Sequence, residues 1–471
     1  MKILLTGATG YIGKRLLPVL VDQGHDVVCC VRDAKKFHPV ESVKTKIQVI
    51  ENDLIHKESL ENIPDDIDIA FYLVHSMSSS RDYQELERQS AVNFREALDK
   101  TNCRQVIYLS GIVNSDSLSK HLTSRKNVEN QLSRGKFALT TVRAGIIIGS
   151  GSASFEIIRD LVEKLPAMIA PRWLKTKCQP IAIRDVIKIL IGIMDNEKTF
   201  DKSFDIGGKD VLTYKEMLLV FAKVRGLKRY VWTVPVMTPK LSSYWLYFVT
   251  STSYKLATSL VDSMKVDIIA KDSELIDMLE IKTLTYEESI EKAFKKIEQN
   301  EILSSWKDST VSGRLEYRIS DHINVPDFGC FKDKRTRRVN DKKATLDKIW
   351  AIGGENGWYF GNYLWEIRGF LDKLIGGVGI RRGRTNNTQI EAGDTLDFWR
   401  VLYSEKDECR LLLFAEMKLP GEAWLEFKID GDNLIQTATF RPKGLLGRMY
   451  WYSVLPFHGI VFEGMIKNLA K

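Results

Sequence analysis

Three glycines, Gly7, Gly10 and Gly13, follow a short apolar run, Lys2–Leu5, near the amino terminus. In a strand–turn–helix unit the first glycine permits a tight turn and the second lets the backbone approach a phosphate. The third lets the helix pack close to the strand. Because a helix begins with free N–H groups and a positive dipole end, the motif predicts an anion-binding turn. A purely structural glycine-rich turn is the alternative.

The motif begins a series of alternating apolar runs and helical patterns. The predicted strands are Lys2–Leu5, Asp26–Val31, Lys46–Ile50, Asp68–Val74, Arg104–Ser110 and Phe137–Val142. Helical stretches separate them, and the longest runs from about Arg81 to Lys100. Strands that alternate with helices predict an α/β fold, a doubly wound parallel sheet covered on both faces. In that context the glycine motif predicts dinucleotide binding.

The end of the second strand bears on which dinucleotide would bind. Arg32 follows Val31 directly, and an arginine there suits the 2′-phosphate of NADP. Asp33 comes next and would suit the ribose hydroxyl of NAD. The sequence therefore favours NADP and leaves NAD open.

These residues resemble the short-chain dehydrogenase/reductase superfamily, with the glycine spacing of its extended and atypical branches. The resemblance covers roughly Met1–Gln299 and implies a Rossmann-like domain in which Asp53 and Leu54 lie near the adenine and Val74 and His75 along the ribose. It also implies that Pro180–Val186 lies beside the substrate region. The cofactor-binding residues predicted in this way are Gly7, Thr9, Gly10, Tyr11, Ile12, Gly13, Arg32, Asp53, Leu54, Val74, His75 and Lys126.

The resemblance breaks where the chemistry of the superfamily resides. Active members use a Tyr-x-x-x-Lys pair; Lys126 matches the lysine, but Leu122 stands at the tyrosine and has no proton to give. The segment that begins His121-Leu122-Thr123-Ser124-Arg125 resembles NmrA-like members and relatives of the complex I accessory subunit. In that group cofactor binding often persists without a demonstrated reaction. Ser110, His121 and Lys126 remain weak catalytic candidates, and His75 is a further histidine that could exchange protons.

The texture changes after the polar stretch Gln299–Ser312, which we interpret as a boundary. Strand-rich runs at Thr395–Tyr403, Arg410–Lys418, Ala423–Ile429 and Asn433–Phe440 predict antiparallel hairpins, and Leu455–Leu469 predicts a final helix. Residues Asp321–Lys471 resemble the DUF2867 domain, which is related to the START-like, helix-grip group. The predicted division is 1–299 for the reductase-like domain, 300–320 for a linker and 321–471 for an α+β helix-grip domain.

Tryptophans are frequent in the second domain. They either fill a core or line a pocket for a hydrophobic small molecule such as a lipid or a quinone. Three functions follow as hypotheses. The chain is a cofactor-dependent sensor or binding protein, an NADPH-dependent oxidoreductase acting on an apolar carbonyl or quinone, or a scaffold or assembly factor of a membrane-associated complex. The missing tyrosine favours the first and the third.

The net charge of +8 is concentrated in one segment. Lys332–Lys343 holds seven basic residues and two aspartates, which we expect to form a loop. A solvated loop is one interpretation; an anionic surface is the other, with membrane headgroups preferred over nucleic acid. The six cysteines show no CxxC spacing, which predicts reduced thiols and no metal site. We expect a cytoplasmic protein without a signal peptide, with peripheral contact at the inner membrane face as an alternative. Leu241–Tyr254 is too short and too polar to span a bilayer.

Overall fold

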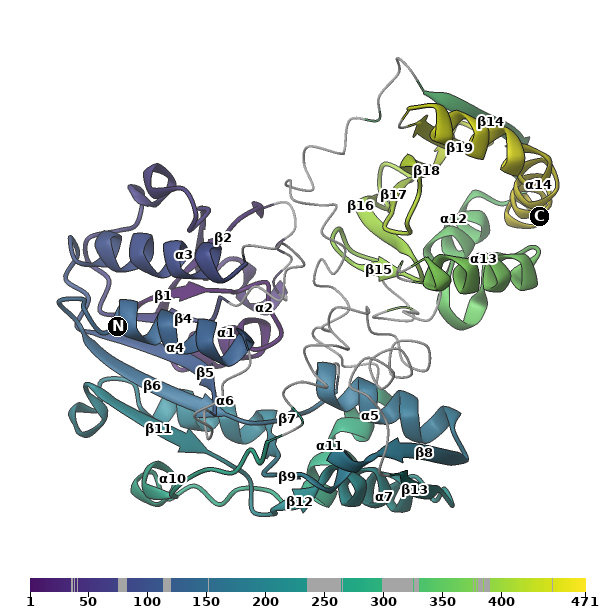
Figure 1. Cartoon of the computed structure of the whole chain (residues 1–471). Helices are drawn as coiled ribbons and strands as arrows, with labels where there is room; N and C mark the ends of the chain where they lie inside the picture. Colours follow the sequence, from purple (N-terminus) through teal and green to yellow (C-terminus); the bar gives the residue numbers. More distant parts are fainter. Residues whose placement is uncertain are drawn as a thin grey trace. The chain divides into compact units, whose positions relative to one another are not determined.

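The chain divides into two compact units, Met1–Ser309 and Thr310–Lys471, in a computed structural model (Figure 1). The structure describes residues 1–34, 37, 39, 41–74, 83–112, 120–150, 152–234, 264, 266–298, 325, 330–375, 377, 379, 384, 390–442 and 444–471. The predicted linker 300–320 and the segment 241–254 lie outside these ranges. Each unit is described by itself.

The first unit is built around a parallel sheet. Its strands are β1 (Lys2–Thr6), β2 (Asp26–Val31), β3 (Ile47–Glu51), β4 (Ile69–Tyr72), β5 (Gln105–Gly111), β6 (Ala138–Ala144) and β11 (Lys202–Ile206), and they pair in the order β11-β6-β5-β4-β1-β2-β3. Its main helices are α1 (Gly13–Asp22), α3 (Tyr83–Leu98), α4 (Lys120–Leu132) and α6 (Ile183–Gly192). The predicted doubly wound α/β fold is confirmed.

Two apolar layers cover the two faces of this sheet. Side chains of α1 and α6, among them Leu16 and Ile189, pack in one buried cluster with β1 and β2. Side chains of α3 and α4, among them Phe94 and Leu132, pack in the other. The chain therefore leaves β1 toward one face and β4 toward the opposite face. This reversal opens a crevice at the carboxyl ends of β1 and β4, where open α/β sheets bind ligands.

Smaller elements complete the first unit. They are α2 (Glu41–Lys44), β7 (Ile147–Ile148), α5 (Ala153–Lys164), β8 (Ala167–Pro171), β9 (Lys177–Cys178), β10 (Ile181–Ala182), β12 (Leu212–Thr213), α7 (Tyr214–Val224), β13 (Tyr230–Val234), α10 (Glu274–Met278) and α11 (Tyr286–Glu298). A capping box opens α7, with Thr213 and Glu216 each bonding the backbone of the other. Thr285 and Glu288 make the same reciprocal bonds at the start of α11. The repeated Leu-Thr-Tyr phrase thus marks two helix starts in the structure.

The second unit pairs an antiparallel sheet with helices. Its elements are β14 (Phe331–Arg338), α12 (Lys342–Trp350), α13 (Asn362–Leu374), β15 (Thr395–Leu396), β16 (Trp399–Glu405), β17 (Arg410–Ala415), β18 (Gly421–Asp430), β19 (Asn433–Pro442) and α14 (Gly444–Ala470). The strands pair in the order β14-β19-β18-β17-β16-β15. The carboxyl-terminal half of α14 covers one sheet face with Phe462, Met465, Ile466 and Leu469. The predicted α+β arrangement, a helix across an antiparallel sheet, is confirmed.

Tryptophans fill the interior of this unit. Trp358 is 1% exposed and packs against Trp365, with the ring centroids 5.4 Å apart. Trp451 stacks between Phe331 and Phe440. Of the two interpretations of these aromatics, the described residues support the packed core.

Two predictions for this unit are wrong. The segment Lys332–Lys343 is not one loop, because Lys332 to Arg338 belong to the edge strand β14 and Lys342 and Lys343 begin α12. An edge strand has one sheet partner and tolerates exposed charges. The last helix begins at Gly444 rather than Leu455 and continues through Pro456. A proline inside a helix removes one hydrogen bond, and α14 accommodates this loss at Pro456.

No helix within the described ranges combines the length and apolarity that crossing a bilayer requires. All six cysteines are free thiols, and burial raises the pKa of Cys29, Cys30, Cys103 and Cys178 to about 12. These buried thiols are held in the unreactive protonated form.

His458 gives the second unit a pH-dependent stability. Burial among aromatic rings lowers its pKa to about 4, from 6.5 in an unfolded chain. Between these values the unfolded chain binds the proton and the folded chain does not. Stability is therefore complete above about pH 6.5 and falls by up to about 3 kcal/mol as the pH approaches 4.

We expect chemical denaturation, followed by tryptophan fluorescence, to show this loss between about pH 7 and about pH 4.5. His458→Phe should reduce the pH dependence, because the substituted ring binds no proton. An equal loss in the variant would contradict this role of His458.

Candidate functional site

The turn between β1 and α1 is held in a narrow range of geometries. The Gly10 amide donates to the Gly7 carbonyl over 2.8 Å, and Gly7 has φ of +71°. Thr6 Oγ1 donates to the Phe71 carbonyl over 2.8 Å and accepts from the Leu73 amide over 3.3 Å. These bonds tie the end of β1 to the end of β4, so the turn lies at the crevice.

Each glycine of the turn has a distinct steric reason. A Cβ on Gly7 would lie 2.7 Å from the Leu73 carbonyl oxygen, and one on Gly13 would lie 2.3 Å from the Gly7 oxygen. A Cβ on Gly10 would meet only the Gly7 oxygen, at 3.1 Å. Gly7 and Gly13 are thus required by the fold, whereas Gly10 borders open space. The open space beside Gly10 is the cradle that a pyrophosphate needs.

The amino end of α1 offers backbone donors to that space. None of the described residues accepts a hydrogen bond from the amides of Tyr11 or Ile12. The first turn of α1 carries Lys14 and Arg15 and no acidic residue. Unpaired amides and a positive helix end favour an anion, so these residues fit a bound nucleotide pyrophosphate.

The side chains of Tyr11 and Arg15 contact each other and connect the turn to the segment at Gly149 and Ser150. The sequence did not reveal this role. The Arg15 guanidinium lies 3.9 Å from the centroid of the Tyr11 ring and donates to the Ser150 carbonyl over 2.7 Å. A Cβ on Gly149 would lie 2.5 Å from the Tyr11 hydroxyl oxygen. Burial raises the pKa of Tyr11 to about 12. Tyr11 therefore contributes its amide to the cradle, while its neutral ring braces the helix.

The carboxyl ends of β2 and β3 place polar groups beside the turn. Arg32 is exposed at the end of β2, whereas Asp33 is 7% exposed. Asp53 follows β3, and its carboxylate accepts from the Ile55 amide over 3.1 Å. The Asn93 amide of α3 donates to the Leu54 and Ile55 carbonyls, each over 2.9 Å. Asp53 and Leu54 therefore lie in a loop after β3 that hydrogen bonds hold in place.

The remaining predicted residues lie around β4, β5 and α4. Val74 is exposed just after β4, and His75 lies outside the described residues. Ser110 is buried at the end of β5, and Lys126 is exposed on α4. His121 and Leu122 belong to α4, but their side chains lie outside the described part of the chain.

Buried polar contacts hold α4 in place. The Ser124 hydroxyl donates to the Glu87 carboxylate of α3, and both side chains are buried. The Tyr108 hydroxyl of β5 donates to the Arg125 carbonyl over 3.3 Å. The Ser-Arg pair that resembled NmrA-like members therefore helps to dock α4, which carries Leu122 and Lys126.

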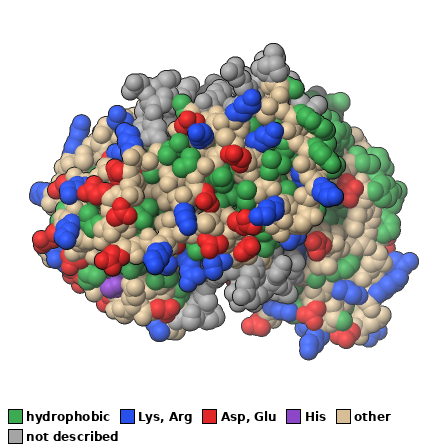
Figure 2. All heavy atoms as spheres, turned by 90° about the horizontal axis from the view of Figure 1, so that it is seen from below, with side chains coloured by type: hydrophobic (Ala, Val, Ile, Leu, Met, Phe, Trp, Pro, Cys, Tyr) green, Lys and Arg blue, Asp and Glu red, His purple; other side chains and the backbone are tan. Residues whose placement is uncertain are grey.

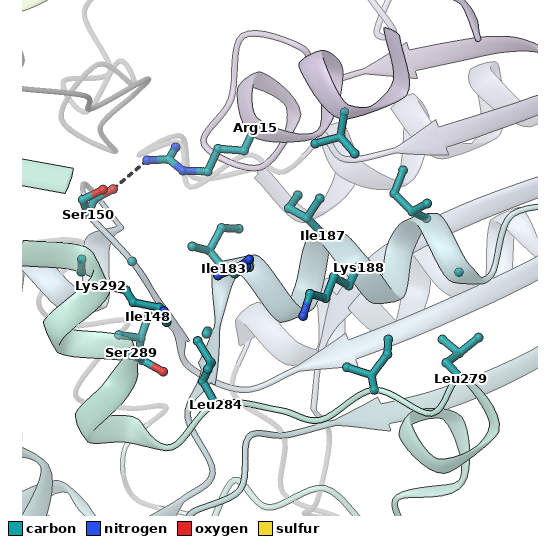
Figure 3. Close-up of a pocket in the computed structure, with 18 of the residues that line it drawn as sticks. Arg15, Ile148, Ser150, Ile183, Ile187, Lys188, Leu279, Leu284, Ser289 and Lys292 are labelled. Atoms are coloured by element: carbon teal, nitrogen blue, oxygen red, sulfur yellow. Dashed lines mark hydrogen bonds between the residues drawn. The ribbon is translucent and has the colours of Figure 1, made fainter. Parts of the chain in front are cut away.

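A separate groove of about 840 Å³ runs along α6 (Figure 3). Its lining includes Ile183 and Ile187 of α6, Val19 of α1, and Leu284. The predicted substrate-side residue Asp185 is fully buried and accepts from the Leu284 amide over 2.8 Å. Asp185 therefore positions the groove wall.

A pair of substitutions tests the cradle. Gly10→Val should abolish nucleotide binding, because the side chain would fill the phosphate space. It should lower thermal stability less than Gly13→Val does, because its Cβ would lie 3.1 Å rather than 2.3 Å from the Gly7 oxygen. Gly13→Val should instead destabilise the fold, because its Cβ collides with the Gly7 oxygen. Calorimetric titration and thermal unfolding measure the two effects. Retained nucleotide affinity in Gly10→Val would refute the phosphate assignment.

Two family models match the chain. Residues 7–147 match a model described as NAD(P)H-binding, and residues 329–465 match one described as a protein of unknown function, DUF2867. A curated relative, the uncharacterized protein YLL056C of Saccharomyces cerevisiae, is 29% identical over 113 residues. That match covers 24% of this chain and 38% of the yeast protein, so the chain spans well under half of that relative.

Solved structures share the fold of the first unit. A nucleoside-diphosphate-sugar epimerase from Staphylococcus aureus aligns with a TM-score of 0.50 at 16% identity, over 62% of this chain and 99% of that one. Citrobacter triphenylmethane reductase aligns with a TM-score of 0.51 at 16% identity, over 63% of this chain and 100% of that one. At these identities the likeness shows the fold alone.

Proposed function

The chain carries a segment that matches an NAD(P)H-binding model, followed by one that matches DUF2867; from this premise we propose that it is an NADP(H)-dependent binding or sensor protein whose first unit is of the atypical short-chain dehydrogenase/reductase class. The carrying observation is the cradle at Gly10, with unpaired amides at Tyr11 and Ile12. The cradle would hold the pyrophosphate whether or not a reaction follows.

The end of β2 supports NADP over NAD. Arg32 is exposed, and its planar guanidinium can donate two parallel N–H hydrogen bonds to a 2′-phosphate. Asp33, the residue that would serve the NAD ribose, is buried. A buried carboxylate is poorly placed to receive a ribose hydroxyl.

The proposal assigns binding rather than turnover because of α4. When bound, the cofactor supplies a nicotinamide ring able to give or take a hydride. The protein must then move a proton at the substrate oxygen, which is the tyrosine's task in the superfamily that this domain resembles. Leu122 occupies that position and cannot donate. Lys126, left without a tyrosine to activate, would serve to hold the ribose.

In a sensor, the oxidised and the reduced cofactor must stabilise different conformations of the protein. A ligand shifts a conformational equilibrium only by its differential affinity for the two conformations. Val74 follows β4, Ser110 lies near the end of β5, and α4 follows β5 in the chain; in this proposal they border the nicotinamide. We propose that this border distinguishes oxidised from reduced nicotinamide and passes the difference to a partner.

Arg32→Ala tests the cofactor preference. We expect NADPH affinity to fall by about 10- to 100-fold, since a hydrogen bond to a charged group contributes about 1.5–3 kcal/mol. NADH affinity should change little, because NADH lacks the 2′-phosphate. Fluorescence titration of the reduced cofactors measures both values. Equal affinities of the parent for NADPH and NADH would remove the role given to Arg32.

A second candidate function is an NADPH-dependent oxidoreductase acting on an apolar carbonyl or quinone. The favouring observation is that Ser110 and Lys126 retain the β5 and α4 positions of two groups used by active superfamily members. The proton donor between them is replaced by Leu122, and Gly111 stands where a second serine is expected after β5.

A substrate screen separates the two functions. We expect no NADPH oxidation with a panel of quinones and aldehydes. The absorbance of the reduced nicotinamide at about 340 nm measures this. Leu122→Tyr should leave NADPH affinity unchanged and is the matched variant that restores a proton donor. Turnover by the parent chain, abolished by Lys126→Ala, would establish the oxidoreductase instead.

A further inference from the structure

One face of α13 is apolar and exposed along its length. Tyr363, Ile367, Phe370, Leu371 and Leu374 recur at helical spacing and are each at least 50% exposed. Their opposite face holds Trp365 and Gly369, which are buried. An amphipathic helix ordinarily packs its apolar side inward, but α13 also carries an apolar stripe outward.

The amino-terminal half of α14 shows the same feature. Leu446, Met449, Phe457 and Ile460 lie on one side of the helix and are 57–72% exposed. From Gly444 to Phe462 the sequence holds a single formal charge, Arg448. This half of the helix is therefore almost uniformly apolar, in contrast to an ordinary surface helix.

The two apolar stripes form one surface. Tyr363 and Ile460 line the same shallow hollow, and Arg368 of α13 donates to the Tyr450 hydroxyl of α14 over 3.4 Å. These contacts place the two helices side by side and antiparallel. Figure 2 shows hydrophobic side chains gathered at its right-hand edge, the side on which Figure 1 draws α13 and α14. We call the nine stripe residues the α13–α14 face.

Cations border this face near the start of α14. Arg448 is exposed and makes no hydrogen bond or ion pair with a described residue. Arg441 is exposed and lies 3.8 Å from Glu422, a weak surface contact. Arg441 belongs to β19, and Arg448 lies near the amino end of α14, where the helix dipole disfavours a cation. An external anion would offset this unfavourable interaction.

The basic strand β14 plays a smaller part than its composition suggests. Arg335 and Arg337 both pair with Glu463 of α14, and Arg335 also pairs with Asp333. Lys332 and Lys334 alternate with Phe331, Asp333 and Arg335 along the strand, and therefore point to the sheet face opposite α14. The positive charge beside the α13–α14 face therefore comes from Arg448 on α14 and from Arg441 at the end of β19.

We propose that the α13–α14 face docks on an anionic lipid membrane, with α13 and the start of α14 lying in the plane of the interface. Apolar side chains would enter the acyl boundary, while Tyr363, Tyr452 and Arg448 would sit at headgroup level. A second copy of the chain fits less well. A twofold interface would bring the Arg441 and Arg448 borders of the two copies together, whereas an anionic surface complements them.

Vesicle sedimentation of the full chain tests this proposal. We expect the chain to pellet with phosphatidylcholine vesicles containing roughly 30% phosphatidylglycerol and less with pure phosphatidylcholine. Ile367→Glu/Phe457→Glu should lower the partition coefficient at least about tenfold, because both side chains are exposed and would carry charge into the acyl boundary. Arg448→Ala should lower it about fivefold.

Leu219→Glu is the matched control. Leu219 is an exposed apolar residue on α7 of the first unit, 37% accessible, and its substitution should leave vesicle binding unchanged. Unaltered NADPH affinity and circular dichroism establish that each variant is folded. Failure of the parent to pellet, or parental binding by the Ile367→Glu/Phe457→Glu variant, would overturn the proposal. A parent dimer that this variant converts to a monomer, without vesicle binding, would assign the face to self-association instead.

Discussion

The close approach of α1 to the end of β1 is the constraint on which the nucleotide unit depends. A side chain on Gly13 would collide with the Gly7 carbonyl. A side chain on Gly7 would collide with Leu73, which directly follows the neighbouring strand β4. Thr6 locks the same two strands through its hydroxyl. The helix start is held there, and no described residue accepts a hydrogen bond from the amides of Tyr11 and Ile12. The same contacts that stabilise the turn thus preorganise the anion site.

The second unit depends instead on an aromatic core. Its aromatic residues pack against one another, and Trp358 anchors the set by donating its indole N–H to Asp397 over 2.7 Å. An interior filled in this way leaves the surface as the place for a hydrophobic partner. The apolar residues of α13 and α14 that do not reach the core remain available there. The Gly10 turn and the α13–α14 face belong to different units, so the two proposals rest on separate observations.

Much of the first unit could be predicted because its signals are local. Alternating apolar runs gave six strands within one or two residues, and Thr-x-x-Glu spacings marked the starts of α7 and α11. The seventh strand, β11, was missed because Lys202–Ile206 is half charged or polar and its partner β6 is far away in sequence. The hydrogen bonds Arg15–Ser150 and Asp185–Leu284 join residues 135 and 99 positions apart, which no local pattern reveals.

The second unit was harder to read for physical reasons. β14 is an edge strand whose sequence is dominated by charge, so period-two alternation carried little hydrophobic signal. The exposed apolar face of α13 could not be predicted, because hydrophobicity in a sequence does not distinguish burial from an unpartnered face. Exposure of Ile367 and Phe370 emerges only from the packing of Trp365 on the opposite side of the helix. Of the candidate site, the glycine turn was predictable from sequence, but its support by Tyr11 and Gly149 was not.

A crystal structure of the chain with NADPH would test the central claim most directly. The account predicts that the pyrophosphate lies on the amides of Tyr11 and Ile12, and that the 2′-phosphate contacts Arg32. It also predicts that Leu122, rather than a proton donor, faces nicotinamide C4. A nucleotide bound away from the Gly10 cradle would contradict the site. A histidine or tyrosine within hydrogen-bond reach of a substrate at C4 would contradict the assignment of binding without turnover.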